Sequence, residues 1–166
     1  YGLLEMAKQA GVERVFIHAF LDGRDVPPAS ALEYIADLEN KLRELGLGQL
    51  ATLGGRYWGM DRDKRWERVE KHYRALVEGE GVKADSASRA VEQSYVASVT
   101  DEFVEPTVIV DSQGNPRGLI RDGDSIIFFN FRADRAREIT RAFVDQDFAG
   151  FTRHKWPQVY FVCLTQ

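Results

Sequence analysis

Residues 125–137 read Ser-Ile-Ile-Phe-Phe-Asn-Phe-Arg-Ala-Asp-Arg-Ala-Arg, and the pattern changes in kind at Arg132. The apolar run before that position is typical of a buried β-strand, whereas residues 136–143 carry apolar side chains at helical spacing. Arg132 and Arg135 therefore lie where a helix begins. The free N–H groups and the positive dipole end of a helix N-terminus favour anions, and the guanidinium fork matches phosphate or carboxylate. We predict a strand, an anion-binding turn and a helix.

Two other apolar strands end in the same kind of sequence. Residues 15–21 run into Asp-Gly-Arg-Asp, and residues 49–53 run into Gly-Gly-Arg, with a further arginine six positions later. The carboxyl ends of neighbouring parallel strands meet at one edge of a sheet, where ligands bind in open α/β folds. If the three strands are neighbours, five arginines and one aspartate converge at this edge: Arg24, Asp25, Arg56, Arg62, Arg132 and Arg135.

The segments between these strands predict the fold class. Amphipathic helices follow the first two strands, and we expect Ser30 with Glu33 to form a capping box and Asp63 to cap the second helix. Residues 107–110 and 118–120 flank a turn-rich insert and predict a hairpin. The expected fold is a three-layer α/β domain. Its sheet is mainly parallel and partly mixed, because of the hairpin, with helices on both faces.

Composition limits the classes of function. The chain has 166 residues, 44% of them hydrophobic and 29% charged, which is typical of one globular domain with a core. The net charge of -4 argues against a nucleic-acid partner, and there is no apolar run long enough to span a membrane. The single Cys163 lies in an apolar run, so we expect a buried thiol and a reducing, cytoplasmic setting.

The three histidines are not spaced in the sequence as the ligands of a metal site would be. We expect His18, inside the first strand, to be a hydrogen-bonded core residue, His72 to lie on a helix surface or its edge, and His154 to be exposed. No Gly-x-Ser-x-Gly motif, Walker loop or paired cysteine and histidine is present. The predicted site can hold an anion, but the sequence offers no nucleophile that would break a P–O bond.

The binding free energy that the arginines can supply indicates the kind of anion. Charge-assisted hydrogen bonds contribute about 1.5–3 kcal/mol each, so two or three well-placed guanidiniums give about 4–8 kcal/mol. That corresponds to a dissociation constant between roughly millimolar and micromolar, which suits a small metabolite with a phosphate and a carboxylate. Asp25 is the exception among the cations. The neighbouring cations keep Asp25 ionised, so its carboxylate is able to accept a proton from a substrate hydroxyl or to orient that hydroxyl. The alternative is a structural role, in which Asp25 pairs with Arg24 or caps a turn.

Three long motifs resemble one known family. They are His-Ala-Phe-Leu-Asp-Gly-Arg-Asp-Val-Pro-Pro at 18–28, Gly-Arg-Tyr-Trp-Gly-Met-Asp-Arg-Asp-Lys-Arg-Trp at 55–66 and Phe-Asn-Phe-Arg-Ala-Asp-Arg at 129–135. In this order they resemble the cofactor-independent (2,3-bisphosphoglycerate-independent), metal-dependent phosphoglycerate mutases, over essentially the whole chain. The resemblance covers the transferase domain, which in that family is inserted into an alkaline-phosphatase-like domain.

The resemblance implies roles for individual residues. The positions that match substrate-binding residues of the family are Arg24, Asp25, Arg56, Arg62, Arg132 and Arg135. Asp25 matches the residue that shuttles a proton at the glycerate hydroxyls, so it is the catalytic residue that the resemblance implies. Ala133 and Asp134 lie inside the last motif, where we expect backbone contact or support.

The resemblance also implies what lies outside residues 1–166. We expect one transferase domain, excised from a two-domain enzyme of glycolysis and gluconeogenesis. The family's other domain carries the serine that becomes phosphorylated and two Mn²⁺ ions, so this domain holds no metal. The implied substrates are 3-phosphoglycerate and 2-phosphoglycerate, the implied state is a monomer, and the isolated domain is expected to be inactive. Two alternatives stay open: a non-catalytic module that binds a phosphorylated acid, and a metal-dependent phosphatase relative.

Overall fold

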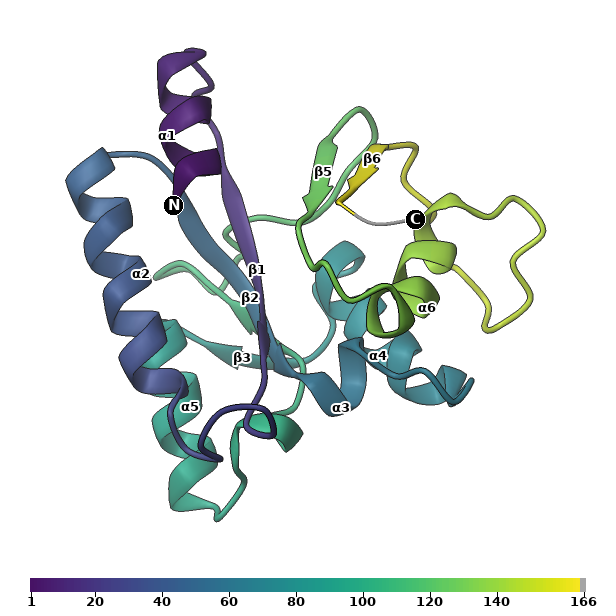
Figure 1. Ribbon diagram of the computed structural model, residues 1–166, viewed down its shortest axis with the longest axis horizontal. Coiled ribbons are helices and arrows are strands. Elements are labelled where there is room, and N and C mark those ends of the chain that lie inside the picture. The colour runs from purple at the N-terminus through teal and green to yellow at the C-terminus, as the bar shows by residue number, and fades with distance from the viewer. Residues whose placement is uncertain (165–166) are drawn as a thin grey trace.

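Helices and strands alternate along residues 1–164, the residues that the computed structural model describes (Figure 1). In chain order they are α1 (Gly2–Gln9), β1 (Phe16–Leu21), α2 (Ala31–Leu45), β2 (Gln49–Gly55), α3 (Arg56–Gly59), α4 (Trp66–Val77), β3 (Val82–Ala84), α5 (Ala87–Val96), the 3-10 helix η1 (Asp101–Phe103), β4 (Thr107–Ile109), β5 (Ser125–Phe128), α6 (Ala133–Val144) and β6 (Tyr160–Cys163). The predicted α/β class is confirmed. None of these helices has both the length and the apolar character needed to cross a bilayer.

The main sheet has the strand order β1-β2-β4-β3. β1 runs parallel to β2, and β3 runs parallel to β4, whereas β2 and β4 are antiparallel. The sheet is therefore mainly parallel and partly mixed, but the predicted hairpin is wrong. Only one bridge joins Val110 to Pro116, and residues 118–120 form no strand. Since β2 and β3 occupy both edges of β4, no edge remains for a hairpin partner.

Helices cover both faces of this sheet, which confirms the three layers (Figure 1). On one face, α2 and α5 bury Ile35 and Val91 against Leu53 of β2 and Ile109 of β4. On the other face, Ala75 of α4 packs on β4. Each buried aliphatic side chain contributes about 1.5–3 kcal/mol, so these contacts fix the strands that end at the predicted site.

The strand that contains Ile126 and Phe128 does not join the main sheet, contrary to the expectation that all three site strands are neighbours. β5 pairs with β6 in a separate two-stranded parallel sheet. α6 and α4 cover one face of that sheet and shield the two side chains, while Ile127 and Val162 on the other face are about half exposed. Cys163 lies on the covered face, with its Sγ 4.0 Å from Thr140 Oγ1 of α6, but it is half-buried rather than fully buried as expected.

One carboxylate caps a helix in place of the predicted residue, and another binds the loop before the next helix. Asp101 accepts hydrogen bonds from the backbone N–H groups of Ser30 and Ala31 at the start of α2 (2.9 and 3.0 Å). The hydroxyl of Ser30 instead donates to Pro27 O, so the predicted capping box is wrong. Before α4, Asp61 rather than Asp63 accepts backbone hydrogen bonds. Asp101 reaches α2 only through the tertiary fold, since it is 70 residues from Ala31 in the sequence, whereas Asp61 lies two and four residues from its partners.

Two histidines lie between the sheet and α4. His18 Nδ1 lies 2.8 Å from Thr52 Oγ1, which confirms a hydrogen-bonded core residue. The surface position expected for His72 is wrong: it is 1% exposed and stacks on Phe20 at 4.5 Å between ring centroids. Position 72 falls three residues after Val69, on the inner face of α4, so helical geometry buries it. His154 is exposed, as expected.

Candidate functional site

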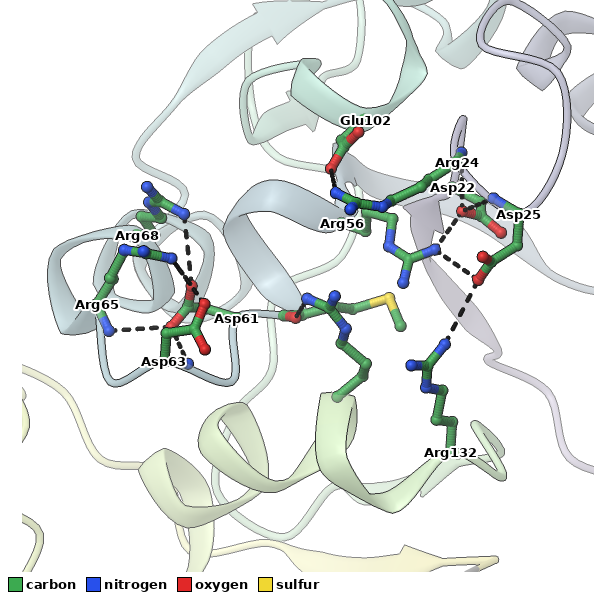
Figure 2. Close-up of polar contacts among 12 residues, drawn as sticks. Asp22, Arg24, Asp25, Arg56, Asp61, Asp63, Arg65, Arg68, Glu102 and Arg132 are labelled. Carbon is green, nitrogen blue, oxygen red and sulfur yellow. Dashed lines mark hydrogen bonds and ion pairs between the residues drawn. The ribbon is translucent and has the colours of Figure 1, made fainter.

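The loop after β1 presents Arg24 and Asp25 to the centre of the site (Figure 2). Asp22 shapes this loop, because its Oδ1 accepts the backbone N–H groups of both residues at 3.1 Å. The Arg24 side chain is 63% exposed and pairs with Glu102 at 3.3 Å. The loop therefore holds Asp25 by its backbone and leaves its carboxylate, which is 61% exposed, toward the other loops.

Arg56 is the first residue of α3 and follows β2 directly. Its side chain is only 4% exposed, and its Nη1 donates to Asp22 Oδ1 (2.5 Å) and to Asp25 Oδ2 (2.8 Å) (Figure 2). Burial acts to raise the pKa of Asp22, but the hydrogen bonds from Arg56 and from the loop backbone outweigh it and lower that pKa. Arg56 thus joins the loops after β1 and β2.

The third loop reaches the same place although β5 lies in another sheet. Arg132, at the N-terminus of α6, points toward Asp25, with 3.6 Å between its Nη1 and Asp25 Oδ2 (Figure 2). Both arginine contacts of Asp25 therefore involve the same oxygen, Oδ2. The structure brings the three predicted loops together, and the packing of α6 beside α4 does so rather than a shared sheet edge.

Asp134 holds two of the arginines at the start of α6. Its Oδ2 accepts from Arg62 (2.7 Å) and its Oδ1 from Arg132 Nε (3.0 Å). The hydrogen bond from Arg62, and then that from Arg132, lower the pKa of Asp134. Ala133, which lies between Arg132 and Asp134 in the sequence, is the first residue of α6 and is half-buried.

Arg135 is held less completely than its neighbours. Its Nη1 donates to Met60 O at 3.0 Å, while its Nε is buried and has no hydrogen-bond partner among residues 1–164. Burial, together with Arg56, Arg62 and Arg132, lowers the pKa of Arg135. This guanidinium therefore lies in a positive environment and keeps unused hydrogen-bonding capacity for an anion.

An open cavity of about 380 Å³ lies beside this cluster. Arg24, Arg56, Arg62 and Arg135 of the predicted set line it; Asp25, Arg132, Ala133 and Asp134 are not among its lining residues. The remaining lining residues are Tyr57, Asp61, Asp63, Arg65, Arg68, Glu102 and Phe103. The cavity is large enough for a small metabolite that carries more than one anionic group.

Sequence reasoning missed part of this lining. Arg68 on α4 is not in the predicted set, but it lies over the ring of Tyr57 at 3.7 Å and pairs with Asp61 at 3.5 Å. Asp61 lies in the loop before α4, so helical periodicity does not relate the two residues, and no sequence pattern indicated their contact. Glu102 had no local signal either, because it belongs to η1 and reaches the site only through the tertiary fold.

The arginines are matched by carboxylates from the chain itself. Arg24 pairs with Glu102, Arg56 with two aspartates, and Arg62 with Asp134. An incoming phosphate or carboxylate would therefore exchange partners with these groups rather than meet bare charges. No group of three or more His, Cys, Asp or Glu side chains in the described part of the chain fits a metal ion, so the described residues do not fit a metal centre.

Known proteins resemble this chain along its whole length. The family described as BPG-independent PGAM N-terminus matches residues 1–166. The chain is 60% identical to the 2,3-bisphosphoglycerate-independent phosphoglycerate mutase of Clostridium perfringens and 58% identical to that of Moorella thermoacetica. These matches cover 99% and 100% of the chain, and the chain spans about a third, 32%, of the length of each relative.

A solved structure gives the same result for the fold. The crystal structure described as Leishmania mexicana phosphoglycerate mutase at low cobalt concentration superposes with a TM-score of 0.91 at 36% identity. The superposition covers 98% of this chain and 31% of that one. The arginine cluster, the fold and these similarities agree, and the chain belongs to the family of 2,3-bisphosphoglycerate-independent phosphoglycerate mutases, matching the N-terminal domain of that family.

Proposed function

We propose that this chain is the substrate-binding part of an isomerase that interconverts 3-phosphoglycerate and 2-phosphoglycerate. The observation that carries the proposal is the position of Asp25, which Arg56 and Arg132 hold from two different loops. A carboxylate fixed among guanidiniums is suited to a substrate that has both anionic groups and hydroxyls. Family membership supports the same reaction.

The geometry supports a division of roles among the residues. Arg24, Arg56, Arg62, Arg132 and Arg135 would bind the phosphate and the carboxylate of the glycerate through charge-assisted hydrogen bonds. Asp25 would use Oδ1, the oxygen that Arg56 and Arg132 leave free, to accept a proton from a substrate hydroxyl. Asp134 would hold Arg62 and Arg132 in place, and the backbone of Ala133 at the helix N-terminus would support the anion.

The bond-breaking chemistry would belong to another part of a longer polypeptide. We propose that residues 1–166 form one transferase domain, and that a phosphatase-like domain of the same polypeptide supplies a serine for the phosphoryl group. That domain would also hold two Mn²⁺ ions, whose established chemistry is to polarise phosphoryl oxygens. The intermediate glycerate would stay bound among the arginines and reorient there. Holding it avoids a second encounter from solution, which increases the rate.

The proposal extends to the setting of the protein. The enzyme would act in glycolysis and gluconeogenesis in the cytoplasm, as a monomer, with no nucleic-acid or membrane partner. Residues 1–166 alone would bind phosphoglycerate weakly and would not isomerise it. Isomerisation of 3-phosphoglycerate by the purified 166-residue chain would contradict this part of the proposal.

Titration of the full-length polypeptide with 3-phosphoglycerate tests the site. Arg132→Ala should weaken binding about 10-fold or more, because it removes a charge-assisted contact. Arg141→Ala is a matched control: it lies on the same helix, is 48% exposed against 47% for Arg132, and also pairs with an aspartate. Equal affinity of the Arg132→Ala and Arg141→Ala variants would remove Arg132 from the site.

Turnover of the full-length polypeptide separates the proposed function from the alternatives. Isomerisation without net phosphate release supports the mutase. Net release of phosphate would indicate a phosphatase in which this domain selects the substrate, and binding without either reaction would indicate a non-catalytic module for phosphorylated acids.

A further inference from the structure

The loop of residues 60–65 carries Arg62 and has a backbone conformation that needs support. Lys64 has a φ of 59°, in the left-handed region that non-glycine residues rarely adopt. Such a conformation persists only where the surrounding structure holds it. The groups that hold this loop therefore determine where Arg62 lies.

Two buried carboxyl groups from different elements bind the backbone of this loop. Asp61, 3% exposed, accepts the N–H groups of Asp63 and Arg65 through Oδ2, both at 2.9 Å. Glu138 on α6, 7% exposed, accepts the N–H of Lys64 through Oε1 at 2.9 Å. Alternate N–H groups of the strained turn are thus bound by Asp61 and by Glu138.

The other oxygen of Glu138 is buried and faces a second carboxyl group. Oε2 is buried and accepts no hydrogen bond from the described residues, and the Asp61 carboxyl lies within hydrogen-bonding reach of Glu138. Burial, and then the neighbouring Asp61 and Asp63, raise the pKa of Glu138, against the opposing effect of the Lys64 N–H. Two cations face Asp61 of the pair: Arg65 and Arg68 lie 3.7 and 3.5 Å from its Oδ1. A protonated Glu138 would be a hydrogen-bond donor to Asp61 and would leave neither buried carboxyl unsatisfied.

We propose that Glu138 is a positioning residue of the arginine site, which acts with Asp61 to lock the 60–65 loop against α6. Helix α6 contacts this loop at three points: Asp134 to Arg62, Arg135 to Met60 O, and Glu138 to the Lys64 N–H. The first two contacts involve residues of the proposed substrate site. The third is buried beneath them, one helical turn further along α6, and fixes the backbone from which Arg62 extends.

This inference rests on the proposed function, and the first test separates the two. In the full-length polypeptide, Glu138→Leu should raise the KM for 3-phosphoglycerate about 10-fold, with a smaller change in kcat, since the arginines bind but do not react. In an Arg62→Ala background the same substitution should have little further effect, because Glu138 acts through Arg62. If Arg62→Ala raises KM and Glu138→Leu does not, the inference fails and the proposed function stands. If neither raises KM, the proposed arginine site itself fails.

A conservative variant keeps the inference testable where Glu138→Leu does not fold. The amide of Glu138→Gln accepts from Lys64 and donates to Asp61 as the protonated acid does, but it does not titrate. As pH rises through the raised pKa of Glu138, the wild-type pair becomes two adjacent buried carboxylates, and its KM should rise relative to that of Glu138→Gln. The ratio of the two KM values at each pH cancels the titration of the substrate phosphate.

Glu67→Gln, an exposed change on α4, is the matched control and should follow the wild type at every pH. A KM ratio between wild type and Glu138→Gln that stays constant across pH 5–9 would overturn the inference. So would a Glu138→Gln variant with the same loss of affinity as Glu138→Leu, because the amide retains both hydrogen bonds.

Discussion

Arg56 Nη1 lies 2.8 Å from Asp25 Oδ2, although the two residues are 31 positions apart in the sequence. The same nitrogen donates to Asp22, so one buried guanidinium fixes the end of β1 relative to the end of β2. This contact makes the site and the stability of the domain depend on the same side chain.

Replacing Arg56 by methionine should therefore lower the free energy of unfolding as well as the affinity for substrate. We expect a loss of about 1–3 kcal/mol at pH 7, because Asp22 and Asp25 lose a charged donor. The pKa of Asp22 is lowered in the folded state, so this stabilisation is present above its unfolded value and is lost as pH falls through its folded value. Urea unfolding at pH 7 and pH 3 measures the difference between wild type and variant, which should shrink at pH 3. Arg89→Met, an exposed arginine on α5 that pairs with Asp85, should change neither value.

His72 should make the domain sensitive to acid. Burial, and then the proximity of His18, lower the pKa of His72 to about 3, and burial lowers that of His18 to about 4. Below pH 6.5, the ordinary histidine pKa, these side chains are protonated in the unfolded chain but remain neutral in the folded chain. The free energy of unfolding therefore falls as the pH drops from 6.5 toward 4. Each histidine contributes a slope of about 1.4 kcal/mol per pH unit.

His72→Leu should reduce this slope by about half, since it removes one of the two titrating groups. It should also stabilise the fold at pH 5, because neither ring nitrogen of His72 has a hydrogen-bond partner among residues 1–164. Thermal unfolding between pH 4.5 and pH 7.5 gives both quantities. The exposed His154→Leu serves as the control, and a parallel loss of slope in that variant would contradict the assignment to buried histidines.

Asp101 should matter more to helix α2 than the residue at its N-cap position. Asp101→Ala removes the acceptor of two backbone N–H groups and of the Tyr95 hydroxyl, and it should cost about 2–3 kcal/mol. Ser30→Ala removes only a hydroxyl that donates to Pro27 O, so its effect should stay below about 1 kcal/mol. Chemical denaturation of the two variants checks the order, and a larger loss for Ser30→Ala would show that the hydroxyl caps the helix after all.

Gly55 is required by space rather than by backbone conformation. Its φ of -68° is open to every residue, but a Cβ at this position would overlap the backbone of Glu102 and Asp101. Gly55→Ala should displace η1 and with it Glu102, the partner of Arg24, so substrate affinity should fall about 10-fold. Titration with 3-phosphoglycerate measures this loss. Gly2→Ala, where a Cβ would meet no atom within 4 Å, should leave affinity unchanged.

The parts of the fold that follow from local chemistry were predictable from the sequence. The apolar runs of β1 and β2 and the left-handed Gly46 that ends α2 depend on residues within a few positions of each other. The arginines of the site were also predictable, because each one directly follows a strand or follows it after a short loop. Their convergence followed from the geometry of parallel strands for the first two loops only.

Features that depend on distant partners could not be predicted in this way. The pairing of β5 with β6 rather than with the main sheet joins two strands that are separated by the whole of α6, and no local pattern specifies it. The role of Asp101 as a cap depends on a residue 70 positions away, and the burial of Glu138 depends on a loop 74 positions away. A charged residue on an amphipathic helix is normally solvent-facing, so no local pattern distinguishes Glu138 from its neighbours.

The uncovered face of the β5–β6 sheet has a consequence for the isolated chain. Ile127, Val162 and Tyr160 are between 51% and 73% exposed on a two-stranded sheet, and Phe129 beside them is 65% exposed. Contiguous apolar surface with open strand edges favours pairing between molecules. Separated from any segment that would cover this face, residues 1–166 should self-associate as their concentration rises.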